Sequence, residues 1–335
     1  MKKSILGLAA LALLASCNND EELNSLAPEA ITFGNPFVDN ATRAIAGDDS
    51  YSGTGVLNSF QVWGNVISQN GTALEVFKDN AVSGEVGSGS VWTVNKQEYW
   101  IWGATYNFAA VVNADKDNNN ASVVALGANL LPAKITYTAD NTNTKDLLYA
   151  EALNVTRSAE TEDKKVPMQF SHLLSKVKFT AVNETSDTDY TFNIKNITIT
   201  NSAAKGYYYP QTYTEGDVTT AKDTWKIDGT GSTTFGAIDG VKYTTSTDTK
   251  FECAKEKLLI PADYTSTKLS VSYTIEWCYK GSVITSASKT STASVNLQKG
   301  YAYNFIIKTG INSPIEFSVE SKPVWTENSG GGLEI

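Results

Sequence analysis

The feature that most constrains the fold is a two-residue alternation of apolar and polar side chains that recurs along the chain. It is clearest between residues 269 and 277, where every second residue is apolar: Leu269, Val271, Tyr273, Ile275 and Trp277. Serine, threonine and glutamate occupy the positions between them. Because successive side chains of a β-strand point to opposite faces, this spacing predicts a strand with one buried and one solvated face.

The same alternation returns at residues 106–112, 301–307 and 315–319. In the stretch YTFNIKNITIT the apolar phase changes between Ile194 and Ile197, so we predict a β-bulge near Lys195 and Asn196 that returns both isoleucines to one face. Polar turn segments separate these runs, and threonine, serine and asparagine are abundant. The sequence therefore predicts an all-β protein of two β-sandwich domains, with a boundary in the charged stretch 158–165.

The N-terminus predicts export and lipid anchoring. Residues 5–15 form an apolar run after a positive end, too short to cross a hydrocarbon core of roughly 30 Å, so residues 1–16 are interpreted as a signal peptide. Leu14 to Cys17 resembles a bacterial lipobox, which predicts an acylated Cys17 that anchors the chain in the outer membrane. An ordinary secretory signal that ends near a cysteine is the alternative.

An acidic cluster, NNDEE, follows at residues 18–22. It resembles the tag that sends lipoproteins of Bacteroidales-type bacteria to the outer face of the outer membrane, and a plain solvated tether is the alternative. The whole chain carries 36 acidic and 27 basic side chains, a formal net charge of -9. Such a field repels phosphate backbones, so nucleic acid is not an expected partner.

No residue pattern indicates catalysis, a metal site or a cofactor, and we predict that the chain is no enzyme. His172 is the only histidine and lies among apolar residues, which favours a structural, hydrogen-bonded imidazole over a catalytic one. Besides Cys17 the chain has only Cys253 and Cys278, too few ligands for a zinc site. In an exported protein these two either form a disulfide or stay as thiols, and the sequence leaves both open.

The densest aromatic region contains Trp92, Trp100 and Trp102. If these side chains are exposed, they form a platform on which sugar rings stack, and the chain is a glycan-binding surface lipoprotein. If they are buried, they belong to a sandwich core. The shared parity of Trp100 and Trp102 on an expected strand favours the core.

Several segments in order resemble the fimbrillin family of type V pili: NATRAIAG around Arg43, VWTVNKQEYWIWGATYNFAA, VPMQFSHLLSKVKF, KLLIPA, LQKGYAYNFIIK, and Trp325 followed by glycines. The resemblance covers nearly the whole chain. It implies two tandem transthyretin-like β-sandwiches, here residues 44–163 and 164–335, on a surface lipoprotein that becomes part of a fimbria and supports adhesion to a host or bacterial surface.

The resemblance also implies an assembly route. An arginine-specific protease removes the N-terminal segment, and a strand from another pilin subunit fills the groove that opens. Arg43 and Ala44 match the cleavage position, so residues 17–43 become an acidic tether with a removable strand at 31–38. The tail ENSGGGLEI fits a donor strand poorly because glycine buries no side chain. Either residues 315–325 do the pairing, or the subunit only accepts a strand as a tip subunit would, so stalk and tip positions both stay open.

Overall fold

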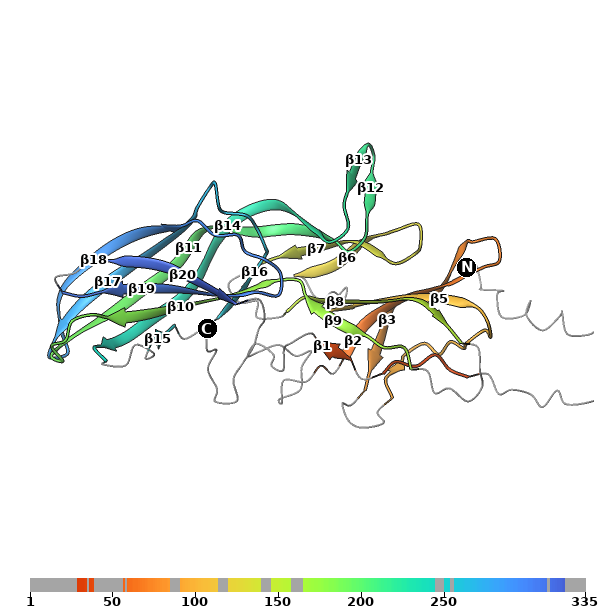
Figure 1. Ribbon diagram of the computed structural model, residues 1–335, viewed down its shortest axis with the longest axis horizontal. Helices are drawn as coiled ribbons and strands as arrows, with labels where there is room; N and C mark the ends of the chain where they lie inside the picture. The colour runs from red at the N-terminus through yellow and green to blue at the C-terminus, as the bar shows by residue number, and fades with distance from the viewer. Residues whose placement is uncertain are drawn as a thin grey trace, which may run out of the picture.

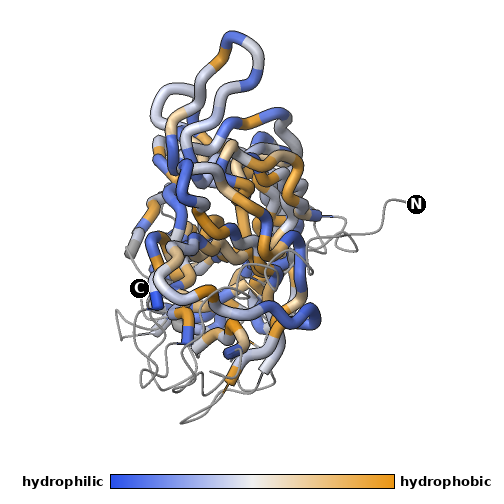
Figure 2. The backbone as a smooth tube through the Cα atoms, turned by 90° about the vertical axis from the view of Figure 1, so that its right-hand side faces the viewer, coloured by the Kyte–Doolittle hydropathy of each residue, from blue (hydrophilic) through white to orange (hydrophobic). Residues whose placement is uncertain are grey.

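The computed structural model describes residues 29–34, 36–38, 57, 59–84, 91–113, 120–139, 146–157, 165–244, 250–253, 256–311 and 314–322. All regular structure in these ranges is β, which confirms the predicted fold class (Figure 1). Figure 2 shows that hydrophobic stretches run mainly through the middle of the molecule, whereas many loops at its margin are hydrophilic.

Three sheets and one hairpin organise the strands. The first sheet has the order β1 (Phe37–Val38), β9 (Gln169–His172), β8 (Leu148–Thr156), β5 (Thr105–Val112), β2 (Ser59–Ile67), β3 (Ala73–Ser83) and β4 (Thr93–Val94). The second has the order β15 (Phe251–Glu252), β10 (Ser175–Asn183), β19 (Ala302–Thr309) and β20 (Glu316–Lys322), and β16 (Lys257–Leu259) also pairs with β10.

The third sheet has the order β18 (Ser282–Ala293), β17 (Leu269–Tyr279), β11 (Tyr190–Tyr209), β7 (Pro132–Thr138) and β6 (Ala121–Leu126), with β14 (Thr224–Lys242) paired to β11. A hairpin of β12 (Tyr213–Glu215) and β13 (Val218–Thr220) projects from the body (Figure 1). Neighbouring strands are antiparallel except for the pairs β1–β9 and β10–β19.

The second and third sheets face each other as a sandwich, and their inward side chains form one core. The alternation that predicted β17 holds: Leu269, Val271, Tyr273 and Ile275 are all buried. Opposite them, Phe179 of β10 and Phe305 of β19 stack with ring centroids 5.2 Å apart. The strand predictions at 301–307 and 315–319 are confirmed as β19 and β20.

Strand β5 of the first sheet is buried on both faces. Tyr106 and Phe108 of β5 belong to one core, whereas Ala109 and Val111 belong to another, which also contains Ile135 of β7. The prediction that the strand at 106–112 has one solvated face is therefore wrong, because β6 and β7 lie beside the sheet and cover its second face (Figure 1). Short Ala and Val side chains at 109–111 permit this close packing.

Strands from both sides of the stretch 158–165 share sheets. Strand β8 pairs with β9, and β7 pairs with β11. Residues 158–164 themselves lie outside the described ranges. The division into residues 44–163 and 164–335 stays a prediction, and any two domains so defined are joined by continuous hydrogen bonding.

The predicted bulge in β11 is confirmed. Its pairing with β17 shifts register between Lys195 and Thr198, and Asn196 has φ 55°. Both Ile194 and Ile197 are fully buried as a result. Asparagine suits this position because its short polar side chain tolerates the left-handed region.

A substitution at this bulge gives a first test. We expect Asn196→Val to lower the free energy of unfolding by ~1–2 kcal/mol, because a β-branched residue is strained at positive φ. Asn196→Gly should keep most of the stability, since glycine adopts this conformation freely. Chemical denaturation of the three proteins measures the difference, and equal losses for valine and glycine would contradict the assignment of strain.

Candidate functional site: the segment that closes the first sheet

The feature that suggests a function is an N-terminal segment that lies between the two ends of the first sheet. Residues 29–34, called the closing segment below, are extended and continue into β1. One neighbour is the stretch 91–100, which contains β4, and the other is the stretch that leads into β9. The closing segment thus lies between the two opposite ends of the seven-stranded sheet and pairs with both.

Backbone hydrogen bonds hold the closing segment on both sides. Phe33 and Trp92 exchange two of them, with N–O distances of 3.0 and 3.1 Å. The Ile31 N–H donates to the carbonyl of Glu98 at 2.8 Å. On the other side, Val166 N–H donates to the Thr32 carbonyl at 2.9 Å, and Gly34 N–H donates to the Val166 carbonyl at 3.0 Å. The segment therefore completes two strand edges at once.

The closing segment also supplies part of the core that contains Tyr106 and Phe108, called the first core below. Ile31 is 3% exposed and Phe33 is 0% exposed. The Phe33 ring lies edge-on to Phe60 and Phe108, with centroids 5.8 and 5.7 Å away. Each fully buried side chain of this kind contributes roughly 1.5–3 kcal/mol, so the core is incomplete without the segment.

An ion pair marks the start of the closing segment. The Glu29 carboxylate pairs with the guanidinium of Arg157, which directly follows β8 and is 2% exposed. The Arg157 guanidinium also lies over the Trp102 ring, 5.3 Å from its centre. No local pattern in the sequence singles out this pair, although Glu29 has the same parity as Ile31 and Phe33.

Tyr106 positions the stretch that receives the closing segment. Its hydroxyl accepts a hydrogen bond from the Ile101 N–H at 2.8 Å. Burial raises the pKa of Tyr106, and the hydrogen bond from Ile101 partly offsets this rise. The hydroxyl therefore stays protonated and fixes the turn next to Trp100, whose N–H donates to the Glu29 carbonyl at 2.9 Å.

The three tryptophans do not form a sugar platform. Trp92 and Trp100 are 0% and 5% exposed and belong to the first core, which confirms the core alternative for both. Trp102 is half-buried under Arg157. The prediction that Trp100 and Trp102 lie on one strand is wrong, because the chain turns at Trp102 and Gly103, where glycine adopts φ +73°.

Of the two downstream cysteines, Cys253 directly follows β15 of the second sheet and Cys278 lies in the third sheet. Both are thiols in the structure, so the disulfide that the sequence left open is not formed. Cys253 Sγ accepts a hydrogen bond from the Phe179 N–H at 3.3 Å, next to β10 of the second sheet. Cys278 lies on β17 of the third sheet, with its Sγ 3.6 Å from Asn193 Nδ2.

His172 is a buried structural residue, as predicted. It is 5% exposed, and its Nδ1 is hydrogen-bonded to the Asp146 carboxylate, which is also buried. No group of potential metal ligands occurs among the described residues. The described ranges likewise contain no helix with the length and apolarity needed to span a bilayer.

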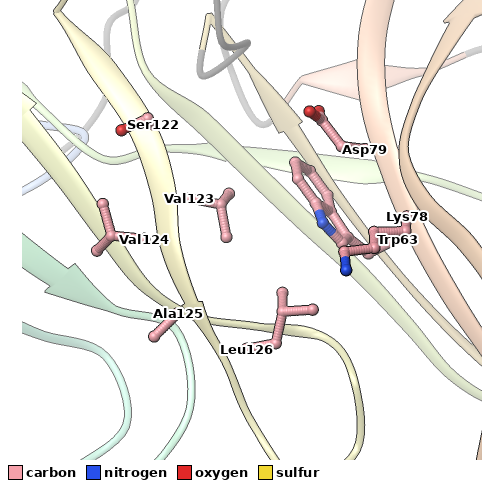
Figure 3. A pocket seen from close by; sticks show the side chains of 8 residues that line it. All are labelled: Trp63, Lys78, Asp79, Ser122, Val123, Val124, Ala125 and Leu126. Carbon is pink, nitrogen blue, oxygen red and sulfur yellow. The ribbon is translucent and has the colours of Figure 1, made fainter.

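A shallow pocket of about 300 Å³ lies where β6 meets β2 and β3. Figure 3 shows Val123 and Leu126 of β6 facing Trp63 of β2 across it, with Asp79 beside the tryptophan. Its walls are mainly apolar, and Asp79 and Lys78 are its only charged lining residues among the described part of the chain. The closing segment is a better candidate site because it combines buried anchors with backbone pairing to two strand edges.

Three predicted site residues, Cys17, Arg43 and Ala44, lie outside the described residues. Lipidation at the first and cleavage between the other two therefore stay predictions. The other arginine of the chain, Arg157, is enclosed by Glu29 and Trp102.

The described geometry defines a class: an all-β protein whose first sheet is completed by a segment from the N-terminal end of the chain. The sequence model named fimbrillin-like matches residues 42–323. The chain belongs to the fimbrillin-like family, as the resemblance implied, and this membership agrees with a non-enzymatic role. A search of curated proteins found no match.

Two solved structures are similar in fold. One is described as a "putative cell adhesion protein" from Bacteroides ovatus; it is 17% identical, with a TM-score of 0.52, and the match covers 90% of this chain and 100% of that one. The other is a fimbrial protein from Bacteroides vulgatus; it is 14% identical, with a TM-score of 0.53, and the match covers 87% of this chain and 98% of that one. At these identities the likeness shows the fold.

Proposed function

We propose that this protein is a subunit of a surface fimbria that supports adhesion and assembles by strand exchange. In this proposal Cys17 carries the lipid anchor at the outer membrane, and a protease cuts after Arg43. The closing segment and β1 then leave the first sheet, and a strand from another subunit replaces them. Family membership and the fold of the fimbrial neighbour support the assignment to fimbriae.

The observation that carries the proposal is the position of Phe33. It is fully buried in the first core, yet it belongs to a segment that precedes the cleavage position and pairs with two strand edges. Removal of the segment leaves the edges at Trp92 and Val166 without their partners and opens the core. Unpaired edges of this kind accept an added strand through main-chain hydrogen bonds.

The burial of Arg157 supports the choice of Arg43. A protease that cleaves after arginine needs an exposed, extended substrate, whereas the Arg157 side chain is 2% exposed and ion-paired. Glycan binding, the second function considered, has no support from Trp92 and Trp100, because both are core residues.

An arginine-specific protease tests the proposal. Treatment of the soluble chain 18–335 is expected to give a new N-terminus at Ala44, no cut after Arg157, and then oligomers detectable by size-exclusion chromatography. N-terminal sequencing and mass spectrometry identify the cut. The Arg43→Ala variant is the matched control and should stay intact and monomeric. Oligomers formed by that variant after the same treatment would rule out processing at Arg43 as the trigger.

A further inference from the structure

Arg157 is a buried cation that faces the closing segment. One of its terminal nitrogens pairs with the Glu29 carboxylate, and its side chain is 2% exposed. Its backbone carbonyl accepts a hydrogen bond from the Gly103 N–H at 2.9 Å, so the residue is tied to the turn that also carries Trp102. The guanidinium lies 5.3 Å from the centre of the Trp102 ring, which is a second neighbour besides Glu29.

The other polar atoms of this guanidinium are buried as well. Arg157 Nε and Nη1 have no hydrogen-bond partner among the described residues. Because an arginine side chain does not lose its proton in proteins, burial cannot be relieved by neutralisation. A buried charge of this kind is tolerated only when a counter-charge accompanies it, and here Glu29 supplies that charge.

Glu29 belongs to the segment that leaves in the proposed function. We propose, on the basis of that function, that Arg157 selects the incoming strand by requiring a carboxylate at the place of Glu29. The partner is an extended segment of another subunit that repeats the pattern of Glu29, Ile31 and Phe33. In this pattern an acidic residue is followed two positions later by an apolar residue and four positions later by an aromatic one. A strand with a neutral or basic residue there would enclose an unpaired guanidinium and bind weakly.

Strand β20 of this chain does not carry this pattern. Its glutamates, Glu316 and Glu320, have the opposite parity to Phe317 and Val319, which pack against the core between the second and third sheets. With its apolar side chains turned inward, β20 would point its carboxylates away from Arg157. The strand that enters the first sheet therefore comes from a different segment.

Amide hydrogen exchange on the intact chain tests the pair without any cleavage. We expect Glu29→Gln and Arg157→Met each to accelerate exchange of the Ile31 and Phe33 amides by about tenfold or more, because both amides donate within the closing segment's edge pairing. Glu98→Gln is the matched control, since this carboxylate pairs with Lys96 at 2.7 Å. Unchanged exchange in Glu29→Gln would overturn the inference.

Competition between two labelled peptides tests the selection itself. Chain cut at Arg43 is offered peptides with the sequence of residues 27–38, one native and one with Glu29→Gln. We expect the native peptide to bind about tenfold or more tightly, and the preference to fall to about one with the Arg157→Met chain. Equal uptake of both peptides by the wild-type chain would overturn the carboxylate requirement and leave strand exchange standing. If the protease does not cut at Arg43, or if neither peptide binds, the result would instead contradict the proposed function. The hydrogen-exchange experiment on the intact chain would then decide the role of the Glu29–Arg157 pair.

Discussion

Replacing Phe33 with alanine is expected to lower the free energy of unfolding of the full chain by about 3–5 kcal/mol, the range for removal of a buried aromatic side chain. Phe33 is fully buried and contacts the rings of Phe60, Phe77 and Phe108. Truncation leaves a cavity among rings that are anchored on three different strands, so the core cannot collapse around it. Equilibrium denaturation of both proteins measures the loss.

The same substitution should lower the stability of the uncut chain but not that of the processed subunit. In the proposed route Phe33 leaves with the segment that ends at Arg43, so material cut at Arg43 and refilled by a common donor peptide should unfold identically whether it came from wild-type or Phe33→Ala chain. The conservative variant Phe33→Leu, which keeps most of the apolar volume, should cost the uncut chain less than alanine does. A processed Phe33→Ala product that remains destabilised would show that the segment stays in place.

Phe179→Ala is also expected to lower the free energy of unfolding by about 3–5 kcal/mol, and this loss should persist after processing. Phe179 lies on β10 at the centre of the core between the second and third sheets, with its ring centroid 4.7 Å from Phe235 and 5.2 Å from Phe305. No residue of the closing segment belongs to this core. Processing therefore cannot replace what the substitution removes.

Denaturation before and after protease treatment checks this second expectation. Phe179→Ala should reduce stability equally in both states, whereas Phe33→Ala should reduce it only in the uncut chain. Phe179→Leu serves as the volume-matched control. A Phe179→Ala protein as stable as the wild type would contradict the assignment of Phe179 to the core of the sandwich.

In the proposed route, the contacts that hold the uncut chain together are the ones that assembly replaces. The closing segment fills two edges, buries Ile31 and Phe33, and neutralises Arg157. An uncut chain thus has no open edge at this place, which protects it from premature pairing. In the proposed route, a cut at Arg43 leaves the same segment held only by non-covalent contacts, and a donor strand at high local concentration competes for its place.

Strand positions were predictable because the information is local. The alternation at 269–277, the phase change between Ile194 and Ile197, and the apolar run at 315–319 each depend on neighbours within a few residues. The bulge at Asn196 followed from parity alone, since two buried residues separated by an odd number of positions need one extra residue between them. Family resemblance then predicted a removable strand at 31–38.

Burial of both faces of β5 was not predictable in this way. Ala109 and Val111 are as apolar as Phe108 and Ala110, but the sequence contains no sign that β6 and β7 lie against them. The turn at Trp102 and Gly103 was also missed, because tryptophan at alternate positions is compatible with a strand. The ion pair of Glu29 and Arg157 joins residues far apart in sequence, so no local pattern contains it.

The sequence by itself determined the all-β class, the main strands of the second and third sheets, the bulge in β11, and the structural role of His172, because each depends on side-chain periodicity or on residue types that are scarce in the chain. Only the tertiary structure decided that two tryptophans are core residues, that Cys253 lies next to the second sheet and Cys278 in the third, and that the closing segment sits between two strand edges with its carboxylate on Arg157. The physical reason is that the contacts between distant surfaces of the chain determine which strands pair and which side chains lose their water. A linear residue pattern does not specify which surfaces meet.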